Sequence, residues 1–142
     1  AVFRKSYAQF ILREDAMLFG FCRQTGRFII GTGLHRFDWK RRVFEIGYWV
    51  RQSAQGQGYA SESTNALIRY TFEALKANKV KICHESGNEA SMRVIQKLGF
   101  EREGVYKSES LLNDGGLYDR HWYGRLDTEG LPPLDVSWGR EP

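Results

Sequence analysis

A short glycine-containing stretch, Gln55-Gly56-Gln57-Gly58-Tyr59-Ala60, has residue types and a spacing that can bind an anion. It follows the apolar run 44–50 and precedes a helical pattern over residues 61–78. Glycine lets the main chain approach phosphate oxygens, because no side chain stands in the way. The first turn of a helix adds unpaired N–H groups and the positive end of the helix dipole. Two glycines alone are a weak signal, but this order of strand, turn and helix predicts a pyrophosphate site.

The composition bounds the class of protein. With 142 residues, the chain is long enough for one domain with its own hydrophobic core. Its 42% hydrophobic and 27% charged residues are typical of a globular protein. The net charge of +4 suits an anionic ligand, and the densest basic group, Lys40-Arg41-Arg42, fits a connection between strands. We therefore expect no nucleic-acid partner.

The two cysteines, Cys22 and Cys83, lie in separate apolar runs, with no second Cys or His at ligand spacing. This pattern favours buried free thiols in a reducing compartment over a disulfide framework or a metal site. No apolar run reaches the roughly 18 residues that a membrane span needs, and no signal peptide is visible. The expected location is the cytoplasm, without a membrane partner.

Hydrophobic periodicity predicts the elements that position the turn. We expect helices over residues 2–14, 61–78 and 89–98, and strands over 16–23, 28–37, 44–50, 80–84, 101–111 and 117–126. Asn88 is a good N-cap for the third helix, and Gly99 is placed to end it. This order predicts an α/β fold with a mixed sheet and helices on its faces. Residues 127–142 are expected to form an extended tail that Trp138 docks onto the domain.

Three motifs in this order carry a family resemblance. Glu45–Val50 resembles a fourth strand, residues 55–60 fit a Gln/Arg-x-x-Gly-x-Gly/Ala signature, and Asn88–Ser91 followed by Lys97–Phe100 fits a later helix. Together they resemble the GNAT superfamily of N-acetyltransferases, most of all the Rim-type ribosomal-protein N-terminal (alanine/serine) acetyltransferases. The resemblance implies a mixed, mostly antiparallel central sheet with splayed middle strands and flanking helices. It places the domain at residues 1–126 and predicts a sheet without the first edge strand of the family.

The resemblance implies acetyl-CoA as the cofactor. The turn would hold the pyrophosphate through residues Gln55, Gly56, Gln57, Gly58, Tyr59 and Ala60. The strand before it would lie along the pantetheine arm and polarise the thioester carbonyl, through the main chain of residues Ile46, Tyr48, Trp49 and Val50. Asn88 would contact the same arm in addition to capping its helix.

The reaction that the family implies is direct attack of an amine on the acetyl thioester. This reaction needs a base for the amine and a proton donor for the leaving thiolate. Many GNAT enzymes use a Tyr as the donor, but Ile95 stands at that position here. Rim-type enzymes suggest Ser91 instead, whose other interpretation is a local hydrogen bond at the helix start.

Two residues are candidate bases. Glu45 is the first, since it lies on the strand beside the expected carbonyl site, and its other interpretation is a surface pairing with Arg41 or Arg42. His84 is the second, at the carboxyl end of the next strand, where it could also be an ordinary strand-end residue.

The acceptor remains open between a protein N-terminus and a small amine such as a polyamine or an antibiotic. A third alternative is a non-catalytic acyl-CoA-binding domain, because the usual Tyr is missing. An exposed edge strand invites pairing with a second chain, so a homodimer is also predicted.

Overall fold

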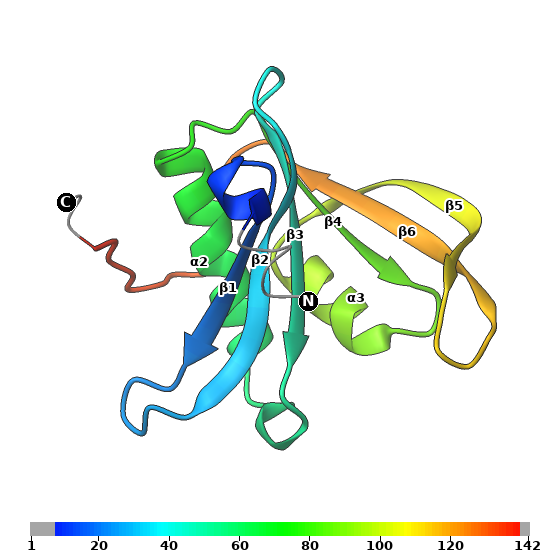
Figure 1. Ribbon diagram of the computed structural model, residues 1–142, viewed down its shortest axis with the longest axis horizontal. Helices are drawn as coiled ribbons and strands as arrows, with labels where there is room; N and C mark the ends of the chain where they lie inside the picture. The colour runs from blue at the N-terminus through cyan, green and yellow to red at the C-terminus, as the bar shows by residue number, and fades with distance from the viewer. Residues whose placement is uncertain (1–7, 140–142) are drawn as a thin grey trace.

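The computed structural model describes residues 8–139, in which strands and helices follow the predicted order (Figure 1). Six strands form one sheet: β1 Ala16–Phe21, β2 Phe28–Asp38, β3 Val43–Val50, β4 Lys79–Glu85, β5 Glu101–Leu111 and β6 Leu117–Arg125. The helices are α2 Tyr59–Glu73, α3 Glu89–Lys97 and the short 3-10 helix η1 Gln52–Ala54. Of the helix predicted over 2–14, residues 8–11 are helical, and 2–7 lie outside the described residues.

The strand order is β1-β2-β3-β4-β6-β5, and every neighbouring pair is antiparallel except β3 and β4. The mixed, mostly antiparallel sheet is therefore confirmed, and the pairs β1–β2 and β5–β6 form antiparallel hairpins. Strand β1 lies at one edge of the described sheet. The homodimer expected from an exposed edge stays a prediction.

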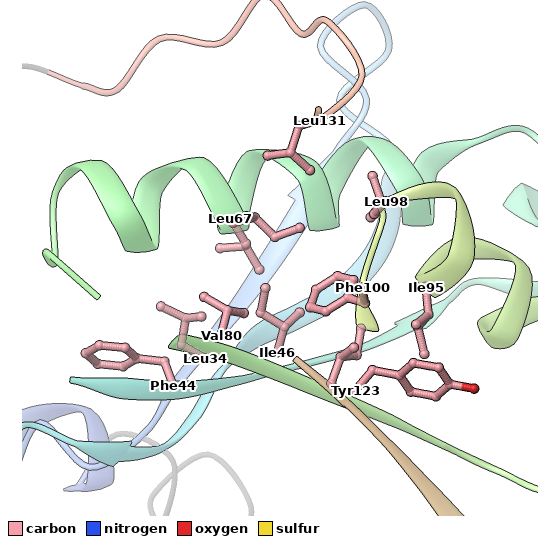
Figure 2. Packing of buried hydrophobic residues seen from close by; sticks show 12 residues of the cluster. Leu34, Phe44, Ile46, Leu67, Val80, Ile95, Leu98, Phe100, Tyr123 and Leu131 are labelled. Atoms are coloured by element: carbon pink, nitrogen blue, oxygen red, sulfur yellow. The ribbon is translucent and has the colours of Figure 1, made fainter. Parts of the chain in front are cut away.

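Alternating side chains give the sheet two different faces. We call the side covered by α2 and α3 the helix face. There, Ile46 of β3 and Ile82 of β4 pack against Ile68 of α2, and all three are at most 2% exposed. Figure 2 shows Ile46 of this core, with Leu34 and Val80 of neighbouring strands, below Leu67 of α2. The alternate residues, which include Glu45 of β3 and Cys83 of β4, point to what we call the opposite face.

Helix α2 differs in its bounds from the predicted span of 61–78. It begins directly after Gly58, whose φ of 84° and ψ of 0° cannot be part of a right-handed helix. It ends at Glu73, and Lys76, with a φ of 53°, turns the chain away from the helical path. Asn78 then donates a hydrogen bond to the Arg41 carbonyl, so it belongs to the connection between strands rather than to the helix.

The segment after β6 packs along the domain without forming a helix or strand in residues 127–139. Leu131 joins the main core cluster. Asn65 and Arg69 of α2 both donate to the Pro132 carbonyl. The predicted docking of Trp138 is confirmed, since its indole N–H donates to Glu73 and its ring contacts Tyr70. No helix in the described part of the chain is long and apolar enough to cross a membrane.

Candidate acetyl-transfer site

The glycine turn presents a row of main-chain donors. Six successive N–H groups, from Gly56 to Ser61, have no hydrogen-bond acceptor among the described residues. Gly56 and Gly58 have φ angles of 73° and 84°, which L side chains rarely adopt. The side-chain amide of Gln55 donates to the Val50 carbonyl, and the side-chain amide of Gln57 donates to the Ser53 carbonyl, both at 3.4 Å. The glutamines thus hold the turn, while its N–H groups and the N-terminus of α2 can bind an anion.

Strands β3 and β4 pair over only three residues each. Their parallel register ends at Glu45 and Lys81, so no strand of the described residues is hydrogen-bonded to the second half of β3, Ile46–Val50, on its β4 side. Figure 1 shows the two strands diverging beyond this point. The splayed middle strands implied by the family resemblance are present, and one edge of β3 is left open to an extended ligand.

Helix α3 meets the splayed strand through a pair of hydroxyl groups. The Tyr48 hydroxyl donates to Ser91 Oγ at 3.0 Å. Desolvation raises the pKa of Tyr48, against a smaller opposing effect of the Ser91 hydrogen bond, so the phenol keeps its proton at neutral pH. Asn88 Oδ1 accepts from the Ser91 N–H at 3.2 Å, which confirms the predicted N-cap. The Ser91 hydroxyl proton is consequently free for another acceptor.

These segments enclose a cleft of about 720 Å³ on the helix face, a size typical of small-molecule sites. All the predicted cofactor contacts line it except Ile46, which is buried in the core, and Gln57. Arg93 and Lys97 of α3 also line the cleft, and no Asp or Glu of residues 8–139 does. The sequence analysis missed these two basic residues, although they lie one helical turn apart on the helix that Asn88 begins.

The two predicted bases lie away from the cleft. Glu45 is 7% exposed on the opposite face, where Arg36 Nη1 binds its carboxylate at 2.5 Å. The predicted pairing with Arg41 or Arg42 is thus replaced by one with Arg36. His84 is 5% exposed, and both of its ring nitrogens have partners, the Glu85 carbonyl at 2.9 Å and the Tyr123 hydroxyl at 3.1 Å.

Sequence reasoning also missed a pair on the opposite face. His35 Nδ1 lies 2.8 Å from both carboxylate oxygens of Asp15. The two residues are 20 positions apart, and the sequence around His35 has an ordinary strand pattern, so nothing in the sequence indicated that they pair.

The cysteines are free thiols, and both are partly rather than fully buried. Desolvation, with a contribution from Glu45, raises the pKa of Cys83 to about 11. At neutral pH this thiol stays protonated and is a poor nucleophile. Cys83 is not among the residues that line the cleft described above.

The residues of the cleft fit coenzyme A. The row of N–H groups and the positive charges of Arg93 and Lys97 suit a pyrophosphate. The open edge of β3 suits the amide groups of the pantetheine arm. Within residues 8–139, no cluster of His, Cys, Asp and Glu could hold a metal ion.

Comparison with known proteins agrees with this geometry. The family model of the acetyltransferase (GNAT) domain matches residues 2–101. A relative from Bacillus subtilis (strain 168), named "Putative ribosomal N-acetyltransferase YdaF", is 38% identical over 96 residues, which cover 68% of this chain and 52% of the relative. The chain thus spans about half the length of this curated relative.

Two solved structures share the fold. RimL, a ribosomal L7/L12 alpha-N-protein acetyltransferase in complex with coenzyme A, has a TM-score of 0.80 and 25% identity, over 88% of this chain and 69% of that one. The spermidine N-acetyltransferase SpeG from Vibrio cholerae has a TM-score of 0.78 and 19% identity, over 87% of this chain and 72% of that one. The SpeG likeness shows the fold alone.

Proposed function

We propose that this chain, which belongs to the GNAT acetyltransferase family, transfers an acetyl group from acetyl-CoA to a primary amine by direct attack. GNAT acetyltransferases use acetyl-CoA, and the structure of RimL contains coenzyme A. When bound, acetyl-CoA supplies an activated thioester carbonyl. The observation that carries the proposal is the unpaired main chain on two sides of one cleft, the Gly56–Ser61 turn and the splayed edge of β3.

Each part of the cleft has a distinct proposed task. The N–H groups of the turn, with Arg93 and Lys97, bind the pyrophosphate. The free edge of β3 and Asn88 hold the pantetheine arm, and main-chain N–H groups of β3 stabilise the charge that develops on the carbonyl oxygen. Ser91 gives its proton to the leaving sulfur, and Tyr48 fixes the orientation of the Ser91 hydroxyl.

The acceptor that we favour is the α-amine of a protein N-terminus. A polyamine is a polycation, and its recognition calls for several free carboxylates. On the opposite face, however, Arg36 binds Glu45, and Glu85 accepts a hydrogen bond from Ser110 and lies 3.9 Å from Arg120. Recognition of a single α-amine does not require several free carboxylates. The names of YdaF and RimL point to the same class of acceptor.

The test combines binding with product analysis. Calorimetric titration with coenzyme A should show one site per chain, and mass spectrometry should find one added acetyl group on peptides that begin with Ser or Ala. The same peptides with a blocked α-amine are the control and should stay unmodified. Transfer to spermidine but not to peptides would establish the small-amine alternative. Binding of coenzyme A without transfer to any amine would establish a non-catalytic acyl-CoA-binding domain.

A further inference from the structure

His35 and Asp15 form an oriented pair at the start of the sheet. Both Asp15 oxygens lie 2.8 Å from His35 Nδ1. Because a carboxylate only accepts hydrogen bonds, Nδ1 carries the ring proton and Nε2 presents a lone pair in the neutral imidazole. Among the described residues, Nε2 has no hydrogen-bond partner. The pair has the arrangement of a base and the group that orients it.

Two glycines place the ring beside the splayed part of β3. A Cβ atom on Gly47 would lie 3.1 Å from His35 Cδ2 and 3.2 Å from Nε2, and one on Gly33 would lie 3.2 Å from Cε1. The imidazole therefore lies directly over Gly47. This residue is two positions beyond Glu45, where the pairing of β3 with β4 ends. The free Nε2 thus lies next to the strand segment that we propose to bind the thioester.

The surroundings of the pair suit an amine that arrives from the opposite face. The His35 side chain is 29% exposed and that of Asp15 is 21% exposed, so both are accessible from solvent. The nearby charged groups include Glu45, which pairs with His35 across β2 and β3, and Arg36, which binds Glu45. Lys81 is the partner of Glu45 across β3 and β4, and its ammonium group lies over the Trp122 ring. The Asp15 carboxylate contacts the imidazole directly, and its negative charge attracts a cationic ammonium group.

We propose that His35 is the catalytic base for the acceptor amine and that Asp15 is its positioning residue, an assignment that rests on the proposed acetyl transfer. His35 Nε2 takes one proton from the incoming ammonium and later releases it to water. The freed nitrogen lone pair forms the C–N bond with the carbonyl carbon, and the C–S bond breaks. Ser91 gives a proton to the sulfur and takes one back from water, and the nitrogen loses its second proton to water. The products are the amide, the thiol and one proton in solution.

The other candidate bases are less available than His35. Arg36 binds the Glu45 carboxylate at 2.5 Å, so this carboxylate already has a protein partner. His84 uses one ring nitrogen toward the Glu85 carbonyl and the other toward the Tyr123 hydroxyl. The chain has three histidines. Within the described residues, His35 is the only one with a ring nitrogen that has no protein partner.

The test compares His35→Gln and Asp15→Asn with His121→Gln and Asp38→Asn, which change the same residue types elsewhere in the sheet. We expect kcat for acetyl transfer to fall about 10²-fold or more in His35→Gln and about tenfold in Asp15→Asn, and to change less than twofold in the controls. Calorimetry should show unchanged affinity for coenzyme A in all four variants, which demonstrates that the fold and the cofactor site are intact. NMR of the ring nitrogens should show His35 protonated at Nδ1, and as a mixture of tautomers in Asp15→Asn.

The results separate this inference from the proposed function. If the wild-type chain transfers acetyl groups and His35→Gln keeps kcat within threefold, His35 is not the base and the acetyl transfer stands. If His35→Gln loses activity and coenzyme A affinity together, the residue is structural and the assignment is overturned. If the wild-type chain acetylates no amine, the proposed function fails and this inference fails with it.

Discussion

The two sides of the gap between β3 and β4 are built in different ways. On the helix face, the cleft is lined by three continuous segments, residues 48–50 of β3, the turn 54–61 and the helix 88–97, and it offers unpaired main-chain groups of the turn and of β3. On the opposite face, the groups come in side-chain pairs from separate places in the chain, such as Asp15 with His35 and Arg36 with Glu45. A site made from continuous main chain leaves a motif in the sequence, whereas one made from side-chain pairs does not.

This difference matches a division of labour. A cofactor that is the same in every member of a family can be held by backbone N–H groups, because they do not depend on side-chain identity. An acceptor that varies between members requires side chains that vary too. We therefore expect substitutions on the helix face to change cofactor affinity or thiolate protonation, and substitutions on the opposite face to change acceptor chemistry.

The largest effect on the helix face is expected for Ser91→Ala. Loss of the proton donor should lower kcat about 10²-fold, with little change in coenzyme A affinity, in steady-state assays and calorimetry. Tyr48→Phe should lower kcat less, since it removes only the group that orients Ser91. Ser63→Ala, on α2 outside the cleft, is the control. Full activity in Ser91→Ala would mean that water, and not a residue of the helix face, protonates the sulfur. The two proton transfers would then not be divided between the helix face and the opposite face.

A smaller effect is expected for Gly58→Ala. The φ of 84° at this position costs an alanine about 1–2 kcal/mol. If the turn relaxes to relieve that strain, its N–H groups no longer converge, and coenzyme A affinity should fall about tenfold by calorimetry. Gly104→Ala is the matched control, because a Cβ atom there meets nothing within 4 Å. Equal affinity in both variants would contradict the role of the turn.

The smallest effect is expected for Arg93→Gln combined with Lys97→Gln. The Arg93 side chain is 70% exposed, and exposed ionic contacts contribute roughly 0.2–1 kcal/mol each. Coenzyme A affinity should fall about two- to tenfold and should depend less on salt than in the wild type. Arg23→Gln combined with Arg27→Gln, in the turn between β1 and β2, controls for the loss of two positive charges. Unchanged salt dependence would leave the turn as the sole pyrophosphate site.

Most of the fold was predictable from sequence because its signals are local. Alternating apolar residues marked β3 and β4, and Asn88 and Gly99 marked the ends of α3. The end of α2 was not predictable in this way. The apolar residues Leu75 and Ala77 continue the helical pattern past Glu73, yet the chain has already left the helix, and both pack on the core from an irregular segment.

The cofactor side of the site was largely predictable, and the partner of Glu45 shows why the opposite face was not. The sequence offers Arg41 and Arg42 as neighbours in the preceding loop. In the structure, the β2–β3 register shifts between His35 and Asp38, and Arg36 has a φ of 48°. This irregularity brings Arg36 to Glu45. It depends on how two strands align across the sheet, which residue types alone do not determine.

The brief pairing of β3 with β4 has a mechanical consequence. Within residues 8–139, three residue pairs are the only ladder between strands β1–β3 and strands β4–β6. The sheet therefore consists of two three-stranded halves that join at one end. Helix α2 contacts β2 and β3 on one side and β4 on the other, and its buried Ile68 packs in the same core as Phe44 and Val80. We therefore expect the width of the gap to depend on the core volume beneath α2, so that a smaller side chain there would shift the two halves without altering any residue of the cleft.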